Sequence, residues 1–322
     1  MIKVGKMYRP WGVIPANLLP LRSDLTIDET AYRDHLRDLA TVRGVTALTA
    51  NGHAAEVATL TREERRVALS IAVDEVGNRV PIISGIYADG TSEAVELARD
   101  AQAEGSAALL VFPSSMFAGC VPYKPEMIYN HFECIAAAVD LPLIAFQYPL
   151  RSGLAYSTDT LVELAQRVPN VVAIKDWSQD IVVFERNLRA LHSLGRPFSV
   201  LTTYSQSLLP SLALGADGLL SGHGSIVAPL QVEMWEAVQR GDLKKARVIA
   251  EQLFILTEVF YAEPFLDMHN RMKEALVMLG KLERAFVRPP LLPIAAAERV
   301  RIRSALMHAG LLADTAVTTG AV

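Results

Sequence analysis

Hydrophobic positions follow two alternating patterns along most of the chain. Short runs that are almost continuously apolar are followed by longer segments in which apolar residues recur every three or four positions. Continuous apolar runs are typical of parallel strands buried on both faces, and the longer period indicates helices. Their alternation predicts a series of βα units. The eight strand-like runs are 11–18, 45–51, 80–87, 107–113, 141–148, 171–175, 198–204 and 216–221.

The segments between these runs carry helix start and stop signals. Thr26 with Glu29, and Thr61 with Glu64, fit capping boxes, in which a hydroxyl and a carboxylate bond the free N–H groups of a first helical turn. Gly105 follows an amphipathic stretch at the point where its helix should end.

The pattern changes after residue 225, where strand-like runs cease. Helical periods continue over 229–240, 243–261, 265–279 and 295–308. Eight βα units followed by helices favour an α/β fold, a closed (β/α)8 TIM barrel over residues 1–225 with a C-terminal helical subdomain over 226–322. A doubly wound sheet is the alternative, but its GxGxxG turn is absent after the first run.

Composition and charge narrow the function classes. The chain has 322 residues, 51% of them hydrophobic, and 31 Lys+Arg against 35 Asp+Glu give a net charge of −4. Such a surface offers no broad cationic face for nucleic acid or an anionic membrane. The only cysteines, Cys120 and Cys134, are too few for a disulfide framework. Prolines interrupt the apolar N-terminal stretch, so no signal peptide is expected. We expect a soluble, cytoplasmic protein.

Polar residues at the carboxyl ends of the strands are the candidates for chemistry, because a barrel builds its active site there. Lys175 closes the run 171–175. Desolvation would lower the pKa of its amine, and a neutral amine can attack a 2-oxo acid and form a Schiff base. A lysine that ends a strand and reaches the solvent is the alternative interpretation.

The segment Val-Val-Ala-Ile-Lys-Asp at 171–176 resembles the Schiff-base strand of the dihydrodipicolinate synthase / N-acetylneuraminate lyase family. Further similarities follow in the same order along the chain, at 60–65, 81–85, 215–221 and 287–291. The resemblance implies a TIM barrel and a class I lyase that holds pyruvate or another 2-oxo acid as an imine on Lys175. It implies no separate cofactor and no metal.

The loop after the second run departs from the family pattern. The family has Gly-Thr-Thr-Gly-Glu where this chain has Gly-His-Ala-Ala-Glu at 52–56. The resemblance implies that backbone N–H groups of His53 and Ala54 hold the substrate carboxylate. The His53 imidazole could also bind the carboxylate or transfer protons, and a histidine hydrogen-bonded inside the loop is the alternative.

The family's Tyr-Asn-x-Pro-x-Arg-Thr-Gly corresponds to 146–153, so Phe146 replaces the proton-relaying tyrosine. A phenyl ring can pack against an imine but cannot exchange a proton. Tyr148 lies two residues later and therefore on the same strand face. We hypothesise that His53 or Tyr148 performs the acid–base work.

Other positions of the expected site either match the family or depart from it. Arg151 matches the arginine that can pair with a second carboxylate, with a rim salt bridge as the alternative. The resemblance implies that Leu220, before Ser221, turns its carbonyl to the imine and that both contact substrate. Ser114 and Ser115 replace a tyrosine pair that completes the site across a subunit interface in some members.

These departures argue against a plain dihydrodipicolinate synthase and favour aldol cleavage, condensation or dehydration of a 2-oxo acid, with an aldehyde as second partner. The family resemblance implies a homo-oligomer, a tetramer or dimer.

Two other classes of function stay open. One is a metal-dependent barrel hydrolase or aldolase using His53, Glu56, Asp176 and His223; the other is a barrel that binds a 2-oxo acid without turning it over.

Overall fold

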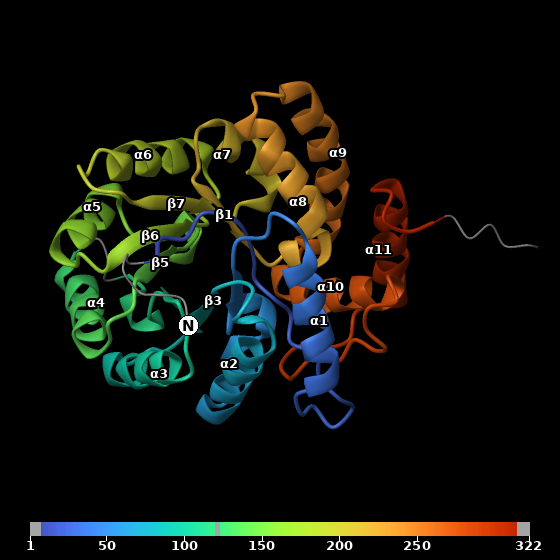
Figure 1. The fold of residues 1–322 in the computed structure, drawn as a ribbon, viewed down its shortest axis with the longest axis horizontal. Coiled ribbons are helices and arrows are strands. Elements are labelled where there is room, and N and C mark those ends of the chain that lie inside the picture. The colour runs from blue at the N-terminus through green and yellow to red at the C-terminus, as the bar shows by residue number, and fades with distance from the viewer. Residues whose placement is uncertain (1–7, 120–122, 314–322) are drawn as a thin grey trace, which may run out of the picture.

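Eight parallel strands curve into a barrel in the computed structural model, which describes residues 8–119 and 123–313 (Figure 1). Strand order around the sheet is β1-β8-β7-β6-β5-β4-β3-β2. Parallel bridges between Val13 and Val45 and between Ala16 and Thr49 join the two remaining edges. The strands are β1 (Gly12–Pro15), β2 (Leu48–Ala50), β3 (Ile82–Ile86), β4 (Ala108–Val111), β5 (Leu143–Gln147), β6 (Val171–Asp176), β7 (Ser199–Thr202) and β8 (Gly218–Ser221). Seven of the eight predicted runs contain one strand each, and β6 extends one residue past the run 171–175, so the predicted TIM barrel is confirmed.

Helices surround the strands and bury their outer faces (Figure 1). Every strand residue is buried, as expected for strands covered on both sides. The barrel helices are α1 (Glu29–Thr41), α2 (Arg62–Val76), α3 (Thr91–Ala103), α4 (Glu126–Ala138), α5 (Thr158–Arg167), α6 (Ile181–His192), α7 (Leu208–Ala213) and α8 (Gly224–Gln239). Within the described ranges, none of the helices is long and apolar enough to cross a membrane.

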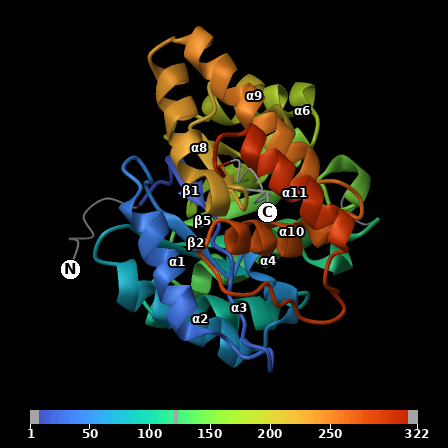
Figure 2. The same cartoon turned by 90° about the vertical axis from the view of Figure 1, so that its right-hand side faces the viewer.

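The C-terminal helices lie together on one side of the barrel (Figure 2). They are α9 (Leu243–Phe260), α10 (Met268–Met278) and α11 (Ala296–His308), with a 3₁₀ turn, η6 (Phe265–Asp267), ahead of α10. The sequence predicted one helix over 265–279, and the structure instead begins it with this turn. The division into domains at residue 225 stays a prediction, since α8 begins at Gly224 and packs on β1 and β8.

The two predicted capping boxes are borne out at one site and wrong at the other. Thr61 and Glu64 form the capping box of α2. Thr26 does not cap α1, because the Asp28 carboxylate lies directly before the helix and accepts a hydrogen bond from Ala31 N at 3.1 Å. The Thr26 hydroxyl bonds Asp24 instead, within the preceding turn.

The cysteines of the chain lie in its middle third. Cys134 lies in α4 as a free thiol, on a helix that covers the outside of the barrel. Cys120 lies outside the described residues.

Candidate active site

Lys175 lies near the carboxyl end of β6 and is only 4% exposed. Strand pairing places it directly beside Phe146 of β5, and its Nζ lies 4.2 Å from the centroid of that ring. Burial disfavours the ammonium form and lowers the pKa of Lys175 to about 7. A substantial fraction of the amine is therefore neutral near pH 7, as a nucleophile requires.

His53 and Tyr148 meet beside this lysine. His53 opens a 3₁₀ turn after β2, Tyr148 follows β5, and His53 Nε2 lies 2.5 Å from the Tyr148 hydroxyl. The Phe146 and Tyr148 ring centroids are 4.8 Å apart, so the two side chains share a face as predicted. Burial, with the nearby charges of Lys175 and His269, lowers the pKa of His53 to about 3, and burial raises the pKa of Tyr148. Both are neutral at pH 7 and share one hydrogen bond whose direction depends on the histidine tautomer.

The turn His53–Ala55 also presents backbone donors. Its hydrogen bonds are donated by Ala55 N to Gly52 O and by Glu56 N to His53 O. The N–H groups of His53 and Ala54 come first in the turn and have no acceptor inside it. Such donors suit a substrate carboxylate.

A small cavity of about 40 Å³ reaches the Lys175 side chain. Four of the predicted site residues line it, namely His53, Ala54, Phe146 and Lys175. The remaining lining residues are Ala16, Trp177, Thr203, Gly222, Tyr261, Phe265, Met268, His269 and Met272. The barrel therefore supplies one side of the cavity, and the segment from the end of α9 to α10 supplies the other.

We call this second side the helical cover, defined as Tyr261, Phe265, Met268, His269 and Met272. Phe265 stacks on Tyr261 with ring centroids 5.6 Å apart and meets Trp177 of the barrel at 5.1 Å. The Tyr261 hydroxyl accepts a hydrogen bond from Ser205 Oγ at 3.3 Å. The cover is mostly apolar and keeps bulk water from Lys175, which strengthens electrostatic interactions in the cavity.

Three predicted substrate-binding residues do not line this cavity. Arg151 is exposed in a 3₁₀ turn after β5. Leu220 and Ser221 are buried at the end of β8, and Ser221 Oγ accepts from His223 N at 3.2 Å. The structure thus brings the lysine, His53, Ala54, Phe146 and Tyr148 together and leaves the roles of these three as predictions.

Ser114 and Ser115, which occupy the positions of the family's tyrosine pair, belong to a turn. Ser114 Oγ donates to the Asp89 carbonyl at 2.7 Å, and the Asp89 carboxylate accepts from Ser115 N at 2.8 Å. Their polar groups support the loop after β4.

The carboxylates considered as metal ligands have partners of their own. Glu56 is paired with Lys273 Nζ and accepts from Arg288 N at 3.0 Å. Asp176 accepts from Ser178 N at 2.8 Å and from Asn187 Nδ2 at 2.9 Å. Over residues 8–119 and 123–313, no group of three or more His, Cys, Asp and Glu side chains is arranged to hold a metal ion.

Sequence reasoning missed most of the far side of the cavity. Trp177 follows Lys175 by two residues, so continuing the strand alternation past β6 would have found it. The helical cover follows no strand, and its apolar residues look like ordinary helix packing. His269 is only 5% exposed and donates from Nδ1 to the Leu266 carbonyl at 2.8 Å.

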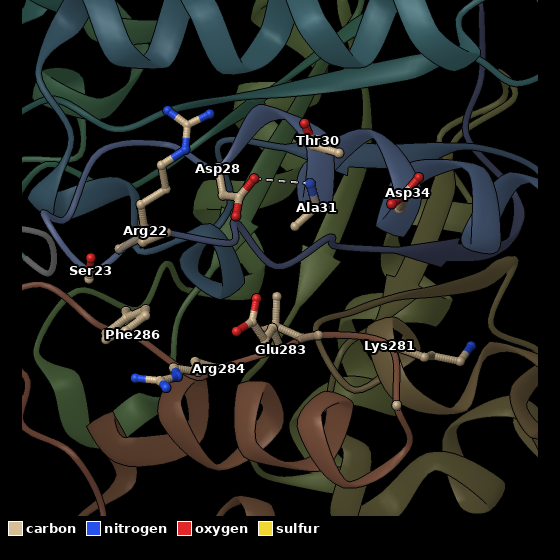
Figure 3. A pocket seen from close by; sticks show the side chains of 13 residues that line it. Arg22, Ser23, Asp28, Thr30, Ala31, Asp34, Lys281, Glu283, Arg284 and Phe286 are labelled. Atoms are coloured by element: carbon tan, nitrogen blue, oxygen red, sulfur yellow. Dashed lines mark hydrogen bonds between the residues drawn. The ribbon is translucent and has the colours of Figure 1, made fainter.

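A larger hollow lies elsewhere in the described part of the chain. It has a volume of about 860 Å³ and lies between the start of α1 and the segment after α10 (Figure 3). Charges of both signs line it, among them Arg22, Asp34, Lys281 and Glu283. Asp28 in its wall already caps α1. No predicted residue lies there, and we place the candidate site at Lys175.

Comparison with known proteins identifies the family of the chain. The model of the dihydrodipicolinate synthetase family matches residues 9–309. The 4-hydroxy-tetrahydrodipicolinate synthases of Bartonella bacilliformis and Methanopyrus kandleri are 31% and 32% identical to the chain, over 94% of it and over 99% and 97% of their own lengths.

Solved structures give the same family. Dihydrodipicolinate synthase from Aquifex aeolicus superposes with a TM-score of 0.84 at 28% identity, covering 95% of this chain and all of that one. A prophage protein of the dihydrodipicolinic acid synthase family from E. coli K12, solved in complex with pyruvate, superposes with a TM-score of 0.85 at 25% identity, over 94% and 99% of the two chains. The chain belongs to the dihydrodipicolinate synthetase family and is a lyase.

Proposed function

We propose that this lyase joins Lys175 to C2 of pyruvate or another 2-oxo acid and catalyses aldol cleavage, aldol condensation or dehydration, in a reaction other than that of a plain dihydrodipicolinate synthase. The observation that carries the proposal is the buried amine of Lys175, which opens onto a cavity beside the His53–Tyr148 pair. The pyruvate complex of the related prophage protein supports a 2-oxo acid as the ligand.

The chemistry follows from the groups present. The Lys175 lone pair attacks C2, and the C2 oxygen leaves as water after two proton transfers, which gives a cationic imine. That imine draws the electron pair of a bond at C3 toward nitrogen and yields an enamine. Backbone N–H groups of His53 and Ala54 hold the carboxylate, while His53 and Tyr148 supply and accept the protons.

Departures from the synthase pattern support a different overall reaction. Phe146 lies against Lys175 at the position of the family's tyrosine relay and carries no exchangeable proton. Ser114 and Ser115 are bonded to Asp89. The lysine chemistry is retained here while proton transfer is assigned to other side chains.

Borohydride trapping tests the proposal. Intact mass spectrometry of the protein treated with pyruvate and borohydride should show one reduced adduct, and peptide mapping should place it on Lys175. The Lys175→Met variant should show none, whereas Lys244→Met, which removes an exposed lysine, should match the wild type. An absent adduct, or one that survives in Lys175→Met, would refute the imine. An adduct without turnover of any 2-oxo acid in a panel would favour a binding protein instead.

The expected partners belong to the same proposal. No cofactor beyond the imine is needed for the steps above, and an aldehyde is the expected second substrate or product. The expected homo-oligomer, a tetramer or dimer, stays a prediction that light scattering of the purified protein would test.

A further inference from the structure

Two residues with a left-handed backbone conformation flank the turn that carries His53. Asn51, directly after β2, has a φ of 53°, and Glu56, which ends the turn, has a φ of 56°. Residues other than glycine rarely adopt this region, because it costs free energy unless the surrounding structure imposes it. Asparagine tolerates the conformation better than most residues, and glutamate has no such preference. The backbone of the turn therefore needs support from other parts of the fold.

The barrel supports the turn at Asn51. The Asn51 side chain is buried, and its Nδ2 donates to the Arg65 carbonyl of α2 at 2.9 Å. The same nitrogen lies 3.4 Å from Ser84 Oγ of β3. The Asn51 carbonyl oxygen packs so closely on β3 that a Cβ added to Gly85 would lie 1.9 Å from it. The side chain and the backbone of Asn51 are therefore both held by the barrel.

Helix α10 supports the turn at Glu56. The Glu56 side chain is 2% exposed, and one carboxylate oxygen pairs with Lys273 Nζ of α10. The other oxygen accepts from Arg288 N at 3.0 Å, and Lys273 also donates to the Phe286 carbonyl at 2.8 Å. Separating a buried carboxylate from its ammonium partner is costly, so this pair resists rearrangement. The turn is thus fixed to the barrel at one end and to α10 at the other.

The turn held in this way places the His53 ring in the wall of the Lys175 cavity. His53 Nε2 lies 2.5 Å from the Tyr148 hydroxyl, and the ring meets Phe112 and Phe146 edge-on, at centroid distances of 4.9 and 5.8 Å. A single 3₁₀ turn has little stability of its own. Relaxation of the backbone at position 51 or 56 would therefore move His53 away from Tyr148.

We propose that Asn51 and Glu56 are positioning residues, whose side chains keep the backbone around His53 in its left-handed conformation and so hold the imidazole against Tyr148 beside Lys175. The proposal rests on the proposed imine function and adds two residues that act through His53. The Asn51 side chain acts by its hydrogen bond to the barrel, and the Glu56 side chain by its ion pair with α10.

Exchange of the pyruvate methyl hydrogens reports the proton transfer that needs His53. Once the imine has formed, the His53–Tyr148 pair takes a proton from C3. The electron pair of that C–H bond forms the C2=C3 bond, and the imine nitrogen becomes neutral. In D₂O the reverse step delivers a deuteron to C3, and hydrolysis then releases deuterated pyruvate. Borohydride trapping needs only the imine, so the ratio of exchange rate to adduct yield isolates the proton transfer.

NMR spectroscopy of pyruvate in D₂O tests the support at Asn51. Asn51→Ala removes the hydrogen bond but keeps a side chain at the left-handed position, so the exchange-to-trapping ratio should fall by about tenfold. Asn51→Gly removes the same hydrogen bond, but glycine adopts a positive φ without strain, so this variant should recover most of the ratio. Asn78→Ala, the same substitution in an exposed turn after α2, should match the wild type.

The support at Glu56 is tested in a Lys273→Met background, in which no buried ammonium is left without its carboxylate. Glu56→Ala in this background should lower the exchange-to-trapping ratio by a similar factor, and Glu56→Gly should restore most of it. Urea denaturation of each variant gives its folded fraction, so that rates are compared for folded protein only.

The outcomes separate this inference from the proposed function. Alanine variants at positions 51 and 56 that keep the wild-type ratio would overturn the positioning role. Glycine variants that are no better than the alanine variants would overturn backbone conformation as its cause. A wild type that forms no pyruvate adduct would refute the imine of the proposed function, and the positioning role with it.

Discussion

The two sides of the Lys175 cavity are built by different means. On the barrel side, Lys175 and Phe146 are neighbours in paired strands, so backbone hydrogen bonds fix their relation. On the helical cover, Tyr261 and Phe265 are joined by ring stacking, and His269 bonds the Leu266 carbonyl one turn from the Lys273–Glu56 ion pair. Strand pairing leaves the relative positions of Lys175 and Phe146 little freedom to change. The side-chain packing of the cover can change with a few substitutions. The barrel side suits the shared step of imine formation, and the cover suits the choice of substrate.

The largest expected effect on turnover lies on the barrel side. Tyr148→Phe and His53→Gln, made separately, should each lower kcat by ~10²–10⁴-fold if their hydrogen-bonded pair transfers protons to the imine. The measurement is steady-state turnover of a 2-oxo acid substrate, with adduct yield determined in parallel.

Tyr156→Phe is the control for these variants. Tyr156 is also buried after β5, but its hydroxyl finds no partner in the described part of the chain and it does not line the cavity. Its loss should leave kcat unchanged. Turnover that survives both the Tyr148 and the His53 substitution would end the assignment of acid–base work to this pair.

The barrel and its lysine could be predicted from sequence because both depend on local rules. Continuous apolar runs are needed wherever a parallel strand is covered on both faces, and eight such runs are visible in the chain. Lys175 ends one of them, which places it at the catalytic end of any TIM barrel. The Thr26 cap was wrong because two competing oxygen acceptors, at Thr26 and Asp28, lie close together, and the nearer one caps the helix.

The ion pair between the two sides should account for the largest change in stability. Lys273→Met leaves the Glu56 carboxylate buried without its ammonium partner, and breaking such a pair costs ~3–5 kcal/mol. Urea denaturation should show this loss in the free energy of unfolding, and the Glu56→Gln, Lys273→Met double variant should recover part of it.

Lys281→Met provides the comparison. Lys281 pairs with Asp38 at 3.3 Å, but both side chains are about half exposed. Solvent screening limits such a pair to ~0–1 kcal/mol. Equal losses in the Lys273 and Lys281 variants would show that the buried pair does not anchor the cover.

The helical cover could not be predicted from the sequence, for a physical reason. Phe265 and Met272 occur in helical patterns that serve equally well for packing against neighbouring helices. Only the path of the chain across the barrel mouth brings them to Lys175. His269 lies one helical turn from Lys273, whose ion-pair partner Glu56 is more than two hundred positions earlier in the chain, and no local signal marks it.

The pH dependence of imine formation tests how well the barrel side excludes water from the Lys175 amine. Burial lowers the pKa of Lys175 to about 7, so the amine is protonated and unreactive below that pH. The rate of pyruvate trapping should fall about tenfold for each pH unit below about 7 and level off above it. His53, with a pKa lowered to about 3, stays neutral over this range and causes no further change in the trapping rate. If the rate of pyruvate trapping instead rose only near the ordinary pKa of lysine, water would reach the amine freely.

The smallest effect is expected on the cover, where it should fall on substrate binding and not on chemistry. Phe265→Ala removes the ring that meets both Trp177 and Tyr261. Aromatic contacts contribute about 0.5–1.5 kcal/mol each, so KM for a 2-oxo acid substrate should rise by roughly two- to tenfold with kcat little changed. Leu266→Ala alters a neighbouring side chain that is 65% exposed and should leave both constants unchanged. If Phe265→Ala instead slowed pyruvate trapping as strongly as it raised KM, the cover would be needed for imine formation itself, and the division between the two sides would not hold.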